Sequence, residues 1–257
     1  MITQLLVVNF LALVAYMSIW FLIAKAHNRL DIVDAAWGSG FALVAWISVL
    51  QNYSLHSVLL GVLVTVWSAR LTRHIGARLR TRRDPRYELI ASKWNGNYWV
   101  RAFFSIYLLQ GVIVWAITIP ISLAAGLQVR PGLTTTFAVI GTAIWAVGFI
   151  IEAISDKQLH DFIANPKNKG EVLDKGLWRY SRHPNYFGEI LIWYGLAVFA
   201  FSASYGWLGL IGPTILAVTI IFASGIPPIE NRKKSDPKYQ AYMNRTSVLV
   251  PLPPRAK

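Results

Sequence analysis

Long apolar runs alternate with short polar segments along the chain, and this pattern predicts membrane helices. A helix needs about 20 consecutive apolar residues to cross a bilayer. Seven runs come close to that length, and we expect each of them to form a membrane helix. They are Leu5–Ala24, Val33–Leu50, Leu59–Arg78, Arg101–Ala124, Thr134–Ile154, Tyr186–Phe201 and Trp207–Ala223. The sequence therefore predicts an all-α integral membrane protein with about seven transmembrane helices.

Two polar stretches are longer than simple turns. Ser155–Pro184 separates the fifth and sixth runs, and Glu230–Lys257 forms a polar tail. The first apolar run has no basic segment before it and no small-residue cleavage site, so we expect it to be a retained helix rather than a signal peptide. Without an internal repeat or a low-complexity region, we expect one membrane domain over residues 1–257.

The positive charge lies almost entirely on one side of the predicted membrane. The chain has 25 Lys and Arg residues against 12 Asp and Glu residues, and a formal net charge of +13. With seven crossings, Arg130 is the only basic residue on the opposite side. Because basic loops stay in the cytoplasm, we expect the N-terminus outside and the C-terminus in the cytoplasm. The bacterial inner membrane is the expected location.

Composition narrows the possible chemistry. Hydrophobic residues make up 55% of the chain and charged residues 14%, whereas a soluble domain has about 25% charged residues. The chain has no cysteine, which excludes disulfides and thiolate nucleophiles. The five histidines are scattered without ligand spacing, so we expect no metal site. The basic residues lie on short loops beside a membrane, which favours membrane lipids over nucleic acid as partners.

An acidic residue stands near the start of the second apolar run. Asp31, Asp34 and Trp37 are spaced three apart and share one face of a helix. Asp31 can be explained as a helix cap. Asp34 lies one turn deeper, where an ionisable group normally faces the bundle interior or a wet cavity. This position makes Asp34 a candidate functional carboxylate.

The most specific stretch is Gly176–Glu189, which ends at the start of the sixth run with Pro184 at the helix entrance. Cationic donors, an amide and two phenols beside a helix N-terminus are what a nucleoside or dinucleotide needs. A basic interfacial belt with aromatic residues is the alternative explanation. The polar members are Arg179, Tyr180, Arg182, His183, Asn185 and Tyr186.

The segment Arg182–Tyr186 resembles the Arg-His-Pro-x-Tyr core of the steroid 5-alpha-reductase family, including its bacterial branch. Sterol reductases and isoprenylcysteine carboxyl methyltransferases share this core. The resemblance continues through Ser155–Asp156 and through the tail from Glu230 to Arg245, and it extends weakly to Arg83–Tyr87. It implies an NADPH-dependent membrane reductase acting on an enone double bond in a steroid-like or other lipophilic substrate.

The same resemblance implies that the two halves of the chain have different functions. Residues 1–130 would line a substrate cavity, and residues 131–257 would bind the cofactor. The candidate cofactor-binding residues are Arg70, Arg86, Asp156, Arg179, Tyr180, Arg182, His183, Asn185, Tyr186, Glu189, Glu230, Arg232, Tyr239 and Tyr242.

The catalytic part departs from the family pattern. Steroid-reducing members place a Tyr where Trp67 stands here, and an indole cannot serve as the proton donor. We take Asp34 and Tyr87 as candidate catalytic residues, and Trp37 and Trp67 as candidate substrate contacts. Two other hypotheses remain open. One is a membrane methyltransferase that uses S-adenosylmethionine, and the other is a non-catalytic membrane scaffold with the same fold.

Overall fold

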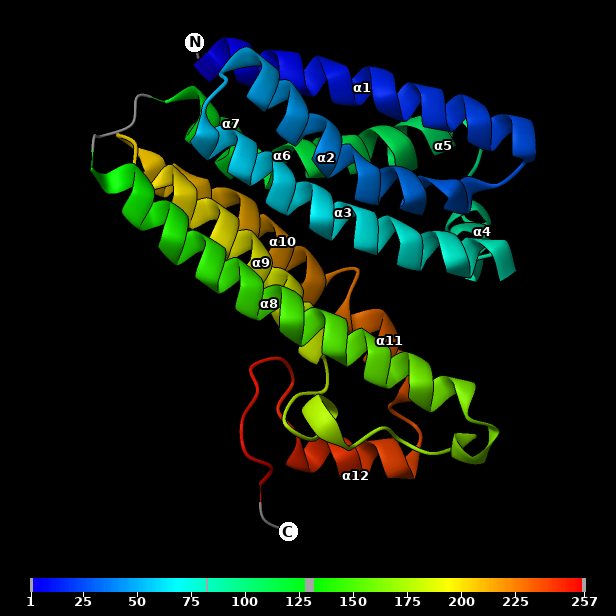
Figure 1. Cartoon of the computed structure of the whole chain (residues 1–257). Helices are drawn as coiled ribbons and strands as arrows, with labels where there is room; N and C mark the ends of the chain where they lie inside the picture. Colours follow the sequence, from blue (N-terminus) through cyan, green and yellow to red (C-terminus); the bar gives the residue numbers. More distant parts are fainter. Residues whose placement is uncertain (1, 82, 128–131, 256–257) are drawn as a thin grey trace. The chain divides into compact units, whose positions relative to one another are not determined.

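The structure is a computed structural model that describes residues 2–81, 83–127 and 132–255, and the named secondary-structure elements of this part are all helices (Figure 1). Within it, the one strand-like contact is an isolated bridge between Ser181 and Ser247. Six helical segments of the described chain are long and apolar enough to cross a membrane: Ile2–His27, Leu30–Gln51, Leu55–Ala77, Tyr98–Ile117, Leu133–Ala164 and Gly206–Lys233. The chain is an all-α membrane protein, as its sequence predicts.

The predicted sixth run corresponds to helix α9 (Pro184–Ala200), which has 17 residues. This is slightly short of the ~20 residues of a typical crossing. The count of seven crossings and the orientation of the chain therefore stay predictions. Arg130, the one exception to the predicted charge asymmetry, lies outside the described residues.

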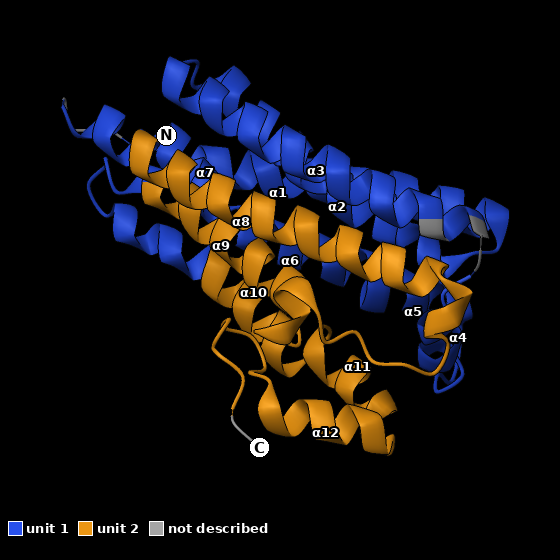
Figure 2. Ribbon diagram, turned by 60° about the horizontal axis from the view of Figure 1, so that its bottom comes forward, with its two compact units in different colours: residues 1–138, 199–212 blue, residues 139–198, 213–257 orange. Residues whose placement is uncertain are grey.

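The chain divides into two compact units (Figure 2). Unit 1 comprises residues 1–138 and 199–212, and unit 2 comprises residues 139–198 and 213–257. The elements of unit 1 are α1 (Ile2–His27), η1 (Leu30–Ile32), α2 (Val33–Gln51), α3 (Leu55–Thr81), α4 (Pro85–Ala91), α5 (Tyr98–Ala102), the π-helical η2 (Phe103–Leu108), α6 (Leu109–Ile117), α7 (Ile119–Gly126) and η5 (Gly206–Leu210). Helix α8 (Leu133–Ala164) begins in unit 1 and continues into unit 2.

In unit 1, α2 packs against both α1 and α3. A buried amide ties three helices together, because Asn9 Nδ2 on α1 donates to Ser48 Oγ on α2 at 3.1 Å and to Ser122 Oγ on α7 at 3.0 Å. Such bonds between membrane helices fix which faces meet, although each contributes only about 0.6–2 kcal/mol. The small hydroxyl side chains also let the helices approach closely.

The predicted fourth span, Arg101–Ala124, is not one continuous helix. The π-helical η2 interrupts it, and α6 ends at Ile117, with Thr118 as a turn before α7. Pro120 accounts for the second break, because a proline inside a helix removes an N–H donor and its ring collides with the carbonyl four residues earlier. The candidate crossing is accordingly Tyr98–Ile117.

Unit 2 is organised around the contact between α8 and α9. A Cβ atom at Gly188 on α9 would lie 2.6 Å from the carbonyl oxygen of Gly148 on α8, and 2.6 Å from the amide nitrogen of Glu152. Only glycine permits so close an approach of two backbones. The other elements of unit 2 are η3 (Pro166–Asn168), η4 (Gly176–Arg179), α10 (Ile211–Phe222, which enters unit 2 at Pro213), α11 (Ile226–Lys233) and α12 (Pro237–Arg245).

Helix α8 is longer than its sequence suggests. We expected the helix to end at Ile154 and a polar loop to follow, but α8 continues to Ala164. The buried Ser155 keeps the helical face continuous, and Leu159 and Phe162 extend that face to the cavity described below. Asp156 therefore lies on a helix rather than in a loop.

Candidate functional site

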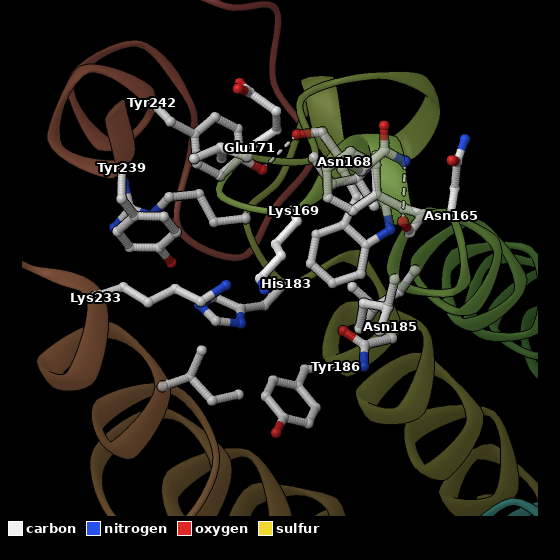
Figure 3. A pocket seen from close by; sticks show the side chains of 18 of the residues that line it. Asn165, Asn168, Lys169, Glu171, His183, Asn185, Tyr186, Lys233, Tyr239 and Tyr242 are labelled. Carbon is white, nitrogen blue, oxygen red and sulfur yellow. Dashed lines mark hydrogen bonds between the residues drawn. The ribbon is translucent and has the colours of Figure 1, made fainter. Parts of the chain in front are cut away.

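Unit 2 contains a cavity of about 470 Å³, within the ~300–1,000 Å³ typical of small-molecule sites. Its wall is built from the end of α8, the loop of residues 165–173, the start of α9, and helices α11 and α12 (Figure 3). Apolar side chains such as Leu159, Phe162 and Ile229 form part of the wall. Polar groups converge from several elements, as a site for a ligand with both apolar and polar parts requires.

The start of α9 supplies an unsatisfied acceptor to this cavity. Pro184 opens the helix, where its missing N–H is not needed, and Asn185 and Tyr186 follow on the cavity wall (Figure 3). Atom Oδ1 of Asn185 is buried and has no hydrogen-bond partner. A buried polar atom without a partner is costly. Asn185 is therefore suited to accept a hydrogen bond from an amine, an amide or a hydroxyl group of a ligand.

Arg182 holds the cavity wall together. Its guanidinium forms a fork on Glu230, with Nε to Oε1 at 2.8 Å and Nη2 to Oε2 at 3.2 Å. Nη1 donates to the backbone carbonyls of Met243 and Thr246, both at 2.9 Å. The side chain is 7% exposed. Arg182 lines the cavity, but these bonds join the start of α9 to α11 and to the end of α12, which is a structural role.

His183 shares the same carboxylate. Its Nε2 lies 3.1 Å from Glu230 Oε1, and its ring stacks on Tyr186 with centroids 5.6 Å apart. Burial lowers the pKa of His183 even though Glu230 opposes the shift. The neutral ring then donates from Nε2 to Glu230, which leaves Nδ1 as an acceptor.

Helix α12 closes another side of the cavity with two tyrosines. The hydroxyl of Tyr242 donates to the carbonyl of Trp178 at 2.5 Å and lies 3.2 Å from that of Ser181, so Tyr242 anchors α12 to the motif loop. Tyr239 is buried beside it, and burial raises its pKa to about 12. The ammonium of Lys233 lies 5.3 Å from the centroid of the Tyr239 ring, in a cation–π contact.

Five of the candidate cofactor residues in unit 2 lie away from this cavity. Arg179 lines a separate hollow of about 420 Å³ together with Lys175 and Arg245. The remaining four are absent from the described cavity lining: Asp156, Tyr180, Glu189 and Arg232. Tyr180 and Arg232 are exposed, whereas Asp156 and Glu189 are half-buried. The candidates that line the cavity are Arg182, His183, Asn185, Tyr186, Tyr239 and Tyr242, with Glu230 behind Arg182 and His183.

Several polar residues of the wall were not predicted from the sequence. Asn165, Asn168, Lys169 and Lys233 all line the cavity. In the sequence, Lys233 is one of several lysines in the basic tail, and no pattern distinguishes it from the others. No sequence pattern distinguishes Lys169 from the neighbouring Lys167, because its position depends on the path of an irregular loop.

Unit 1 brings together the two candidate catalytic residues. The Tyr87 hydroxyl on α4 and Asp34 Oδ1 on α2 are 2.5 Å apart. Gln110 Nε2 on α6 lies 3.3 Å from the same hydroxyl. Burial raises the pKa of Tyr87, and the neighbouring carboxylate raises it further. Tyr87 therefore keeps its proton near neutral pH, and Asp34 and Gln110 orient it.

Arg86 is engaged by carboxylates in this unit. Its guanidinium contacts Asp84 Oδ2 at 2.8 Å and Asp34 Oδ2 at 3.3 Å. These bonds connect α4 to α2, so in this structure the guanidinium of Arg86 is held beside the candidate catalytic pair. Arg70, the other candidate phosphate contact, is half-buried on α3.

The two candidate substrate contacts belong to one row of aromatic side chains. The ring of Trp37 meets Phe41 edge to face at 5.4 Å, and Phe41 meets Trp67 at 5.2 Å. Trp67 is completely buried, whereas Trp37 is half-buried. The row gives this part of unit 1 a rigid apolar wall.

The described residues contain no group of three His, Asp or Glu side chains that could hold a metal ion. In the described part, unit 1 brings together Tyr, Asp and Gln side chains, and the cavity of unit 2 carries aromatic, amide and cationic groups.

Comparison with known proteins places these features in a family. The chain is 28% identical to the uncharacterized protein C594.04c of Schizosaccharomyces pombe over 189 residues, which cover 60% of this chain and 54% of that protein. It is 29% identical to 3-oxo-5-alpha-steroid 4-dehydrogenase 1 of Macaca fascicularis over 113 residues, which cover 44% of this chain and 40% of that enzyme. The chain thus spans about half the length of the curated relatives it matches. No solved structure matches it significantly.

The similarity to a steroid dehydrogenase agrees with the resemblance found at Arg182–Tyr186, although it does not identify a particular branch of the steroid reductases. The model of a family described as protein of unknown function (DUF1295) matches residues 20–246, which include both polar clusters. The chain belongs to the DUF1295 family.

Proposed function

We propose that this protein is an NADPH-dependent membrane reductase that reduces the enone double bond of a steroid-like or other lipophilic substrate. The observation that carries the proposal is the cavity of unit 2, where the unpartnered Oδ1 of Asn185 lies among aromatic and cationic side chains. The similarity to a steroid dehydrogenase supports the choice of reaction.

The residues of the cavity fit a dinucleotide. Asn185 Oδ1 can accept from the carboxamide, the ribose hydroxyls or the adenine amine, all of which are donors. The rings of Tyr186 and Tyr239 offer surfaces for base stacking. Lys169 and Lys233 supply positive charge for phosphate. Arg182 and Glu230 would hold this wall in place rather than contact the cofactor.

NADPH, when bound, supplies a hydride to the β-carbon of the enone. The protein must then stabilise the enolate oxygen and provide a proton. The Tyr87–Asp34 pair in unit 1 holds a hydroxyl proton between two oxygens 2.5 Å apart, and we assign the donor role to it. Gln110 donates to the Tyr87 oxygen and fixes its direction. An apolar substrate would reach such a pair from the surrounding lipid.

Ligand-dependent thermal stability of the purified protein in detergent tests the cofactor assignment. A ligand of the folded state present at 100 times its Kd stabilises by about 2.7 kcal/mol. We expect NADPH to raise the unfolding midpoint and S-adenosylmethionine to leave it unchanged. Asn185→Ala should reduce the NADPH effect, whereas the matched control Asn244→Ala, on the exposed side of α12, should not.

Three results would contradict the proposal. Stabilisation by S-adenosylmethionine alone would favour a methyltransferase. No stabilisation by either compound would favour a membrane scaffold without catalysis. Equal losses in the Asn185 and Asn244 variants would show that NADPH does not bind at the start of α9.

A further inference from the structure

Two lysines reach the cavity of unit 2 from different segments. Lys169 lies in the loop after η3, and Lys233 ends α11. Figure 3 shows both side chains extending toward His183 from different sides of the cavity. Lys233 is steadied by its contact with the ring of Tyr239, 5.3 Å from its ammonium. Two positive charges therefore converge on one part of the wall.

Neither lysine forms an ion pair with a carboxylate in the part of the chain that the structure describes, and Asp236 acts on Lys233 only from beyond ion-pair distance. Glu171 is the one acidic residue in the described lining, and it pairs with Lys238 at 2.6 Å. Glu230, behind the wall, is bonded to Arg182 and His183. Bringing two like charges together without a directly paired counter-ion is unfavourable, and an anionic ligand group between them would reduce that cost.

We infer that Lys169 and Lys233 bind the 2′-phosphate of NADPH and thereby select NADPH over NADH; this inference rests on the proposed function. A phosphate monoester carries a charge of about −1.5 to −2 at neutral pH and offers three acceptor oxygens. Each ammonium has three donors and a flexible stem, so two lysines can share one such group without a fixed geometry.

The solvent exposure of Lys169 and Lys233 favours the 2′-phosphate, rather than the pyrophosphate, as the group that they bind. Both lysines are exposed to solvent along much of their length, so they stand at the mouth of the cavity rather than at its base. The 2′-phosphate is a terminal group that can remain partly hydrated. The pyrophosphate links the two halves of the dinucleotide and therefore lies deeper in a site that encloses both halves.

Direct binding measurements test the inference without relying on turnover. The affinities of NADPH and NADH would be measured by nucleotide fluorescence for the purified protein and for Lys169→Ala and Lys233→Ala. Charge-assisted hydrogen bonds correspond to about tenfold or more in affinity, and solvent screening reduces this at exposed positions. We expect each variant to weaken NADPH binding about three- to tenfold, and NADH binding less than twofold.

The chain offers a matched control for each variant. Lys167 and Lys234 are exposed neighbours of the two lysines and do not line the cavity. Lys167→Ala and Lys234→Ala remove the same charge, so they should leave the ratio of the two affinities unchanged. Lys233→Arg keeps the charge and should retain most of the preference for NADPH.

The outcomes separate this inference from the proposed function. If the wild-type protein binds neither nucleotide, the proposed function fails and the inference fails with it. If it binds both nucleotides and the variants weaken both equally, the lysines contact a group that NADPH and NADH share, and only the inference is overturned. An unchanged ratio in both alanine variants overturns it too.

Discussion

Replacing Arg182 by Met is expected to destabilise unit 2 severely. Arg182 makes four hydrogen bonds, two to Glu230 and one each to the carbonyls of Met243 and Thr246. Methionine fills a similar volume but donates no hydrogen bond. The variant would leave the carboxylate of Glu230, which is 16% exposed, with only the His183 ring, 3.1 Å away, as a side-chain hydrogen-bond partner among the described residues.

The expected loss follows from these contacts. Two carbonyls that lose their donor cost about 1 kcal/mol each, and a largely buried carboxylate that loses its cationic partner adds a further ~1.5–3 kcal/mol. We therefore expect Arg182→Met to lower the free energy of unfolding by about 3–5 kcal/mol. Arg182→Lys keeps the charge but cannot form the fork, so its loss should be smaller, about 1.5–3 kcal/mol.

Unfolding in mixed micelles, followed by tryptophan fluorescence, would measure these losses. A double-mutant cycle with Glu230→Gln isolates the interaction of the pair, and we expect a coupling of at least about 1.5 kcal/mol. Arg232→Lys, an exposed change on the same helix as Glu230, is the control. A loss below about 1 kcal/mol for Arg182→Met, or a coupling near zero, would refute the structural role of Arg182.

Three further predictions test other parts of the structure. Gly188→Ala places a Cβ atom 2.6 Å from a backbone oxygen and should lower the free energy of unfolding by about 1–3 kcal/mol. The control Gly76→Ala places its Cβ atom where no other atom lies within 4 Å and should stabilise its helix by about 0.5–1 kcal/mol. The thermal unfolding midpoints of the two variants would be compared. Burial lowers the pKa of His183 below its usual value of 6.5, so the unfolded chain binds a proton more readily than the folded one. The contribution of His183 to the free energy of unfolding should therefore be complete above pH 6.5 and decrease as the pH drops below it. This pH dependence should disappear in His183→Asn. Tyr87→Phe removes the hydroxyl beside Asp34 and should slow enone reduction about 10²–10⁴-fold with NADPH binding unchanged; unchanged turnover would exclude Tyr87 as the donor.

The helices were largely predictable because a membrane helix depends on local composition. Apolar runs indicated the start of each candidate crossing within a few residues, whereas the ends of several crossings lie further from the predicted ones. The π-helical segment at 103–108 could not be predicted, because it depends on how neighbouring helices pack. The break at Thr118 has a local cause in Pro120, so the position of this proline in the sequence was sufficient to predict the break. The extension of α8 to Ala164 was missed because Asp156 and nearby polar residues outweighed the apolar period through Phe162.

The residues of the candidate site could be predicted where they belong to one continuous motif, but not where tertiary contacts determine the position of a side chain. The Arg182–Tyr186 core indicated the correct segment, and three of its polar side chains together with Tyr186 line the cavity. The partners of Arg182 include the backbone carbonyls of Met243 and Thr246, and no pattern of side chains can reveal a carbonyl as a partner. Arg179 belongs to the same motif but lines a different hollow, because sequence proximity does not determine which way a loop faces.

The contacts of Arg182 and Tyr242 have a consequence for synthesis of the protein. The cavity needs α12, and Arg182 completes its bonds only with carbonyls at positions 243 and 246. A ribosome that has just made Arg182 must therefore add about 60 more residues before the partners of this cationic side chain are made. During that interval Arg182 and Glu230 need water or anionic lipid headgroups to solvate them. Emergence of α12 from the exit tunnel, rather than membrane insertion of the earlier helices, would be the step at which the cavity can first form.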